Sequence, residues 1–292
     1  MSTVTWKSVF SIIGCCVAFL TAGVTMGAEE EIRLIIRGDD MGMTHGSLVA
    51  FEKAFNEGVL TCASVQVPAP WFEAAAELSK KNPGWCIGVH LTVIGEWRGY
   101  RWRPVLPWNK VASLVDEDGF FYCHPDELIS HNPKPEEIEA EFRAQIELAQ
   151  KKGIEVQYLD RHYLGYSKYP PLKGILDRLG SDYNLPISGT MGETRIPGVY
   201  KSAVHKKKQL AVKQLKELRP GLWIWVTHLG IDSPEQNALI HFRPHPVFSK
   251  GMAKHRAAEL EVLTSAEVRN MILEKGIKLT NYRELWKERN KQ

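Results

Sequence analysis

Short apolar runs alternate with longer amphipathic segments from residue 31 to the C-terminus. Apolar runs of this length are typical of buried strands, and apolar residues at helical spacing are typical of amphipathic helices. The predicted strands are residues 32–37, 62–67, 85–91, 156–159, 187–189, 222–226 and 277–280. The predicted helices are residues 47–56, 71–81, 135–152, 172–179, 206–218 and 265–275.

Repeated strand–helix units predict a parallel sheet, because parallel strands need a crossover connection that is usually helical. About seven units in a chain of this length favour one α/β domain, an irregular (β/α) barrel that is TIM-barrel-like. A doubly wound open sheet is the alternative. No glycine-rich phosphate loop follows the first strand, so the sequence does not support nucleotide binding.

The N-terminus has a different pattern. Lys7 precedes residues 9–24, which are mostly apolar and uncharged, and Gly27-Ala28 comes before an acidic run. This pattern is typical of a secretory signal peptide, which we place at residues 1–28, with the folded domain at 29–292. We therefore expect an exported protein, periplasmic or extracellular, with no stable membrane span after cleavage. An uncleaved membrane anchor at the N-terminus is the alternative, because Met26 stands where a small residue is preferred.

Composition adds little to this picture. The chain has 292 residues, of which 44% are hydrophobic and 24% charged, and a formal net charge of +3. That charge is too small to indicate a nucleic-acid partner. Cys62, Cys86 and Cys123 lie outside the predicted signal peptide and lack metal-binding spacing. We expect Cys62 and Cys86 to be buried free thiols, and a disulfide to Cys123 stays open.

Carboxylates and imidazoles follow four of the predicted strands, at the point where each strand ends. They are Asp39 and Asp40, His90, Asp160 and His162, and His228. The carboxyl ends of parallel barrel strands converge on one face, where active sites are built. One carboxylate and two neutral imidazoles are typical of a catalytic site for a divalent metal ion, with positions left for water and substrate.

Such a site would suit hydrolysis. The metal would lower the pKa of its bound water and polarise a carbonyl group. A second carboxylate beside the metal ligand would serve as general base, and a further histidine would protonate the leaving group. The adjacent pair Asp39-Asp40 suits this division, with one carboxylate on the metal and the other facing the water.

Five segments carry a resemblance to a known family. They are LIIRGDDMG at 34–42, GVLTCAS at 58–64, GVHLT at 88–92, DRH at 160–162 and LTSAEVRNMILEKGIKLTNYREL at 263–285. In this order and spacing, the chain resembles the YdjC-like carbohydrate deacetylases from about residue 32 to residue 286. That family includes chitooligosaccharide deacetylases and relatives linked to hopanoid synthesis. The resemblance implies an irregular (β/α) barrel that removes acetyl groups from N-acetylated sugars or oligosaccharides with one divalent metal ion, Mg or Zn.

The resemblance also implies roles for single residues. Asp40, His90 and His162 match the metal ligands of the family, and Asp39 matches the general base. His228 matches the histidine of a late strand-end motif, which is a candidate acid or a residue on the oxyanion side.

Residues 93–134 form a long segment, which we expect to lie as an insert over the active-site face. Its aromatic residues alternate with arginines. Aromatic rings stack on sugar faces, but they also pack loops against a core, and the sequence leaves both interpretations open. The substrate-binding candidates are Asp160, Trp97, Trp102, Arg103 and His45, with Asp160 also a candidate for orienting its neighbours.

The chain departs from the family pattern in three motifs. Tyr163-Leu164-Gly165-Tyr166 replaces a histidine-rich run, His228-Leu229-Gly230 replaces His-Pro-Gly, and Gly-Asp-Asp-Met-Gly replaces Ala-Asp-Asp-Phe-Gly. None of these changes removes a proposed ligand, but they leave the sugar undetermined. The alternative functions are a non-catalytic carbohydrate-binding protein on the same scaffold and a metal hydrolase of another amide or ester. The identity of the metal, the acetyl position and the oligomeric state stay open.

Overall fold

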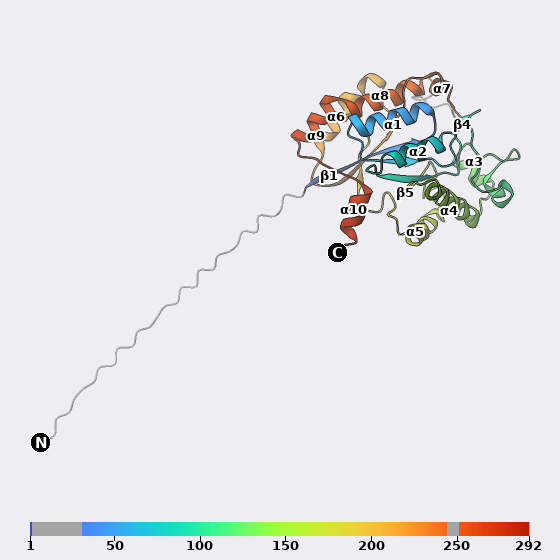
Figure 1. The fold of residues 1–292 in the computed structure, drawn as a ribbon, viewed down its shortest axis with the longest axis horizontal. Helices are drawn as coiled ribbons and strands as arrows, with labels where there is room; N and C mark the ends of the chain where they lie inside the picture. The colour runs from blue at the N-terminus through green and yellow to red at the C-terminus, as the bar shows by residue number, and fades with distance from the viewer. Residues whose placement is uncertain (2–30, 244–250, 292) are drawn as a thin grey trace.

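The computed structural model describes Met1, residues 31–243 and residues 251–291, whose arrangement is drawn in Figure 1. The predicted signal peptide, residues 1–28, lies outside this part of the chain except for Met1, so export stays a prediction. Among the described residues, none of the helices combines the length and apolar character needed to cross a membrane.

A parallel sheet with the strand order β5-β3-β2-β1-β7-β6 forms the centre of the fold, and β9 also pairs with β1. The strands are β1 Ile32–Met41, β2 Cys62–Val65, β3 Ile87–Leu91, β5 Val156–Arg161, β6 Thr194–Arg195, β7 Gly221–His228 and β9 Lys278–Thr280. The sheet is curled into a half-barrel, which confirms the α/β, barrel-like fold. The predicted strand 187–189 contributes only a single bridge, between Ile187 and Leu159 of β5.

Strand β1 is buried because it lies between neighbours on both sides. Leu34, Ile35 and Ile36 have no exposed surface, and β1 pairs with β2, β7 and β9. The strand continues beyond the predicted end at residue 37, so Asp39 and Asp40 belong to it and are themselves buried.

Helices cover both faces of the sheet, with α1, α6, α8 and α9 on one side and α4 and α5 on the other (Figure 1). The helices are α1 His45–Glu57, α2 Phe72–Lys81, α3 Pro125–Ser130, α4 Pro135–Lys151, α5 Leu172–Asp182, α6 Lys207–Glu217, α7 Pro234–Asn237, α8 Met252–Thr264, α9 Ala266–Glu274 and α10 Tyr282–Arg289. Local signals fix several helix starts: Thr44 and Ser47 form a capping box at α1, and Ser265 caps α9.

Four helices were not predicted from the sequence: the short α3 and α7, and the longer α8 and α10. In α8 the buried positions include Arg256 and Glu259 among apolar residues, so charged groups interrupt the apolar stripe. The segment 93–134 is also more ordered than a plain loop. It contains β4 Trp97–Arg98, which pairs antiparallel with β8 Ile240–His241, and the short 3-10 helices η1 Trp108–Lys110 and η2 Ala112–Leu114.

The three cysteines of the described residues, Cys62, Cys86 and Cys123, are buried free thiols. No disulfide forms between them in this part of the chain. Burial raises the pKa of Cys86 to about 12 and that of Cys62 well above its ordinary value, because a thiolate loses its hydration there.

Candidate active site

A cavity of about 600 Å³ lies at the carboxyl ends of the strands. Four strands supply the polar side chains that the sequence placed there: β1, β3, β5 and β7. The predicted residues that line this cavity are Asp39, Asp40, His90, Trp97, Asp160, His162 and His228.

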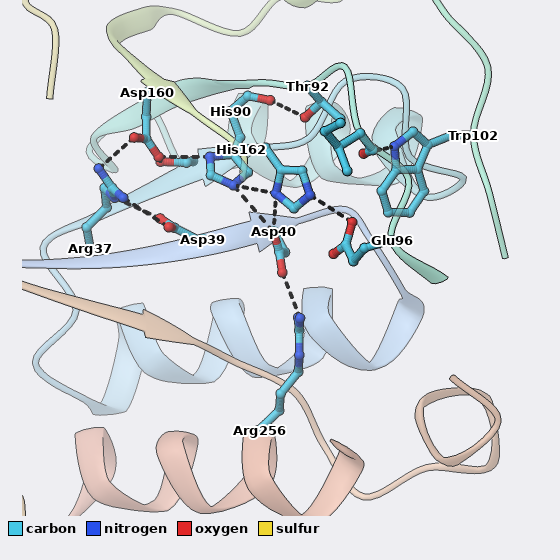
Figure 2. A network of polar contacts seen from close by, with 12 residues as sticks. Arg37, Asp39, Asp40, His90, Thr92, Glu96, Trp102, Asp160, His162 and Arg256 are labelled. Atoms are coloured by element: carbon cyan, nitrogen blue, oxygen red, sulfur yellow. Dashed lines mark hydrogen bonds and ion pairs between the residues drawn. The ribbon is translucent and has the colours of Figure 1, made fainter. Parts of the chain in front are cut away.

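Asp40, His90 and His162 direct one ligand atom each toward a common point (Figure 2). Oδ1 of Asp40 lies 3.4 Å from Nε2 of His90 and 3.5 Å from Nδ1 of His162, and the two nitrogens are 3.1 Å apart. All three side chains are buried. Their donor atoms could therefore hold one metal ion, with further positions left for water and substrate.

The backbone at Asp40 is strained. Its φ is +67°, a left-handed conformation that residues other than glycine rarely adopt, and the register between β1 and β2 shifts between Gly38 and Met41. A bulge of this kind re-aims a side chain near the end of a strand. Here the carboxylate that follows Asp39 faces the two histidines instead of continuing the alternation of the strand.

Each of the three candidate ligands has a charged partner on its far side. Nη2 of Arg256 donates to Oδ2 of Asp40 at 2.7 Å. Because a carboxylate only accepts hydrogen bonds, Nδ1 of His90 donates to Asp160 at 2.8 Å and Nε2 of His162 donates to Glu96 at 2.9 Å. When both rings are neutral, these bonds leave Nε2 of His90 and Nδ1 of His162 as the acceptor atoms that face Asp40, which is how outer residues orient metal-binding histidines.

The charges around this point fit a divalent cation. Four buried carboxylates and two buried guanidiniums meet here, so two negative charges are uncompensated whenever both imidazoles are in the neutral form that binds metal. The six residues are Asp39, Asp40, Glu96, Asp160, Arg37 and Arg256. One divalent ion would balance the cluster.

The same excess of negative charge raises the pKa of both histidines. Burial by itself would lower the pKa of His90, but Asp39 and Asp160 outweigh it and raise the pKa to about 9. Burial is likewise outweighed at His162, where Glu96 and Asp40 raise the pKa to about 10. Burial would also raise the pKa of Asp40, yet Arg256 and the histidines hold that pKa well below its ordinary range.

Arg37 holds Asp39 in place. Its Nε and Nη2 atoms donate to the two carboxylate oxygens of Asp39 at 2.7 and 2.9 Å, and its Nη1 lies 2.9 Å from Asp160. Asp160 is thus fixed between Arg37 and His90, a position that fits the orienting role better than contact with substrate.

His228 lines the same cavity from the end of β7. Its ring stacks on Tyr200 with 4.1 Å between centroids, and within the described part of the chain its Nδ1 atom has no hydrogen-bond partner. Burial lowers the pKa of His228 and outweighs the opposite effect of Asp40. The imidazole is therefore neutral at neutral pH.

The sequence profile described as YdjC-like protein matches residues 33–274. The chain belongs to this family. The match confirms the resemblance seen in the motifs.

This YdjC-like protein aligns with its relatives over nearly the whole fold. It is 28% identical over 270 residues to a carbohydrate deacetylase of Brevibacillus brevis, covering 87% of this chain and 100% of the relative. It is also 28% identical over 264 residues to a carbohydrate deacetylase of Enterococcus faecalis, covering 87% and 98%. The crystal structure of a putative cellobiose-phosphate cleavage protein from Enterococcus faecalis V583 has a TM-score of 0.70 and 26% identity, covering 87% of this chain and 99% of that one.

Three substrate-binding predictions do not match the cavity of this YdjC-like protein. Trp102 is 2% exposed and donates its Nε1 hydrogen to the Ile94 carbonyl, so it packs the core. The guanidinium of Arg103 lies 4.0 Å from the Phe120 ring, and the His45 ring lies against Trp71 in a tilted contact with 4.9 Å between centroids. Trp102, Arg103 and His45 are not among the residues that line the cavity. Trp97 does line it, although its ring is nearly fully buried beside Arg256.

Other residues of the site were not found from the sequence. Arg37 had a signal, since it is a charge in an apolar strand and shares a strand face with Asp39 two positions later. Glu96 lies in the irregular segment after β3, and Arg256 lies in the helix that was not predicted, so neither had a local signal.

Proposed function

We propose that this YdjC-like protein is a metal-dependent hydrolase that removes acetyl groups from N-acetylated sugars or oligosaccharides. The proposal rests on one observation: the donor atoms of Asp40, His90 and His162 converge in the same cavity as Asp39 and His228. The names of the full-length relatives, carbohydrate deacetylases, support the choice of an acetylated sugar as substrate.

The cofactor in this proposal is one divalent metal ion held by Asp40, His90 and His162. One carboxylate oxygen and two imidazole nitrogens suit zinc better than magnesium, which prefers oxygen ligands. When bound, the ion supplies a lowered pKa for a coordinated water and polarises the acetyl carbonyl. The second carboxylate, Asp39, stays available because Arg37 holds it.

In this mechanism Asp39 accepts the proton of the attacking water, and Arg37 fixes the carboxylate in the geometry that general-base catalysis needs. The amide C–N bond then breaks, and the proton held by Asp39 leaves with the amine. His228 stands on the oxyanion side. Its lowered pKa favours a neutral ring that donates a hydrogen bond over an imidazolium acid.

Acetate release from N-acetylglucosamine oligomers, measured after chelation and after addition of Zn²⁺ or Mg²⁺, tests the proposal. We expect release that depends on metal. Asp40→Ala should lose metal binding and activity together, whereas Asp39→Asn should keep the metal and lose turnover. Full activity of Asp40→Ala would overturn the metal assignment. Sugar binding by calorimetry without any acetate release would instead indicate a carbohydrate-binding protein.

A further inference from the structure

Three cationic side chains line the cavity outside the metal cluster: Arg161, Arg195 and Lys201. Arg161 is the last residue of β5 and Arg195 is the last residue of β6. These two strands are the opposite ends of the sheet order. Because the sheet is curled, both of its edges border the same cavity and each edge contributes an arginine to it.

The outer cations differ from the inner ones in what they contact. Arg37 and Arg256 are bonded to the carboxylates of the metal cluster. Arg195 and Lys201 are exposed, and neither has an ion pair or a side-chain hydrogen bond within the described residues. Arg161 donates to the carbonyl of Leu164, which carries no net charge.

One acidic residue outside the metal cluster, Glu193, also lines the cavity, and its carboxylate is bonded to neutral groups rather than to any of the three cations. The carboxylate of Glu193 accepts hydrogen bonds from the backbone N–H groups of Gly189 and Met191, at 2.6 and 2.8 Å, and from the hydroxyl of Tyr282 at 2.8 Å. Both of its oxygens are used to shape its own loop. Because three cations face this single carboxylate, the outer part of the cavity presents net positive charge to a ligand.

An exposed aromatic ring lines the same cavity. Tyr163 lines the cavity and is 44% exposed, in contrast to Trp97 and Trp102, which are buried. It directly follows the candidate ligand His162 and has a φ of +52°, a conformation that tyrosine rarely adopts. Backbone strain of this kind gathers at ligand-binding positions, and an exposed aromatic face suits stacking on a sugar ring.

We propose that the substrate is an acidic acetylated sugar, whose ring stacks on Tyr163 and whose carboxylate or phosphate binds Arg161, Arg195 and Lys201. This inference rests on the proposed function, because it concerns a second group on the same substrate. Guanidinium groups bind carboxylate and phosphate oxygens in pairs, and positive charge in a concave site attracts anions before contact.

Three probes of matched size separate the outcomes: neutral N-acetylglucosamine, N-acetylmuramic acid with its carboxylate, and N-acetylglucosamine 6-phosphate. Each is measured for acetate release and, by calorimetry, for binding. We expect one acidic probe to have a kcat/KM at least about tenfold above that of the neutral sugar, mainly through KM, as a charge-assisted hydrogen bond would give. Whichever acid is preferred identifies carboxylate or phosphate as the anion.

The variant Arg195→Gln/Lys201→Gln should remove that preference and leave the neutral probe within about twofold, since the lost bonds involve only the anion. The control Lys216→Gln/Arg219→Gln removes the same charge from exposed positions that do not line the cavity. Tyr163→Ala should weaken binding of all three probes, whereas Tyr163→Phe keeps the ring and should not.

Two results would overturn the inference while leaving the proposed function intact. One is a kcat/KM for the neutral sugar equal to or above those of both acids. The other is an acid preference that survives in Arg195→Gln/Lys201→Gln. If neither these probes nor the N-acetylglucosamine oligomers release acetate, the proposed function fails. The inference is then decided by calorimetry alone, where anion binding lost in the double variant supports it and absence of anion binding overturns it.

Discussion

Arg256 donates a hydrogen bond to Oδ2 of Asp40 at 2.7 Å, while the other oxygen of the same carboxylate faces His90 and His162. Both partners are almost fully buried, at 1% and 2% exposure. The carboxylate is thus shared between a cation of the protein and the point where a metal ion would bind. Arg256 fixes the orientation of Asp40, and the metal affinity should depend on it.

Arg256→Met should weaken the site in two ways. It leaves the Asp40 carboxylate buried without its partner, which destabilises the metal-free fold by roughly 3–5 kcal/mol, and it should cost about 10–100-fold in metal affinity. Urea unfolding with a chelator measures the first effect, and calorimetric Zn²⁺ titration measures the second. As a control, Arg178→Met removes an exposed partner of Glu139 and should leave stability nearly unchanged, because water screens an exposed ion pair. Unchanged Zn²⁺ affinity in Arg256→Met would contradict the assigned role.

Glu96 should set the nitrogen through which His162 binds metal. Glu96→Ala removes the acceptor of the Nε2–H bond, so the ring is free to rotate, and we expect a loss of about 10–100-fold in metal affinity. Glu96→Gln keeps an acceptor oxygen and should lose less. Zn²⁺ titration of both variants gives the order of their metal affinities. Glu136→Gln, at the exposed start of α4, is the control. Equal affinities of Glu96→Ala and the native protein would refute the role.

The strand-end residues were predictable because the signal for them is local. Each follows an apolar run, and parallel strands bring their carboxyl ends together wherever the runs lie in the chain. Asp39, Asp40, His90, His162 and His228 accordingly line one cavity. The curl of the sheet and the position of its two edges depend instead on long-range pairing, which no local pattern specifies.

The sequence did not predict the partners of the strand-end residues, and the reason is physical. Arg256 is buried on α8, where its charge breaks the apolar periodicity that marks a helix. In residues 93–134 the alternation of aromatic residues and arginines suggested substrate contacts for Trp102 and Arg103, which do not line the cavity. Alternation along the sequence does not determine which rings face the cavity. Trp102 turned inward to the core, and the exposed ring at the cavity belongs to Tyr163.

The stability of the protein should fall at alkaline pH because of its buried thiols. The pKa of Cys86 is raised to about 12 by burial, so between pH 9 and 12 the folded state keeps a proton that the unfolded chain releases. The contribution is complete below about pH 9 and is lost as the pH rises, by up to about 1.4 kcal/mol per pH unit. The free energies of unfolding of the native protein and of Cys86→Ala should differ at pH 8 and lie closer together at pH 10.5. A constant difference between them would exclude this effect.

Glu259 should position His228 from behind. Its Oε2 accepts hydrogen bonds from the hydroxyl of Thr227 at 2.6 Å and from the backbone N–H of His228 at 2.9 Å. Its Oε1 lies 3.1 Å from Nζ of Lys207, which also donates to the carbonyl of Tyr200, the residue stacked on His228. Lys207 and Glu259, which are 0% and 1% exposed, therefore connect Tyr200 with His228 at the candidate oxyanion site.

Variants of this pair separate charge balance from positioning. Glu259→Gln alone leaves the ammonium of Lys207 buried without a counter-ion, which should cost roughly 3–5 kcal/mol of stability. Lys207→Met/Glu259→Gln removes that charge and keeps an acceptor for His228, so stability and kcat should both recover. Lys207→Met/Glu259→Leu should fold as well but have a reduced kcat with little change in KM, because His228 loses its anchor. Urea unfolding and acetate release test these outcomes, and a native kcat in the leucine variant would show that Glu259 does not position His228.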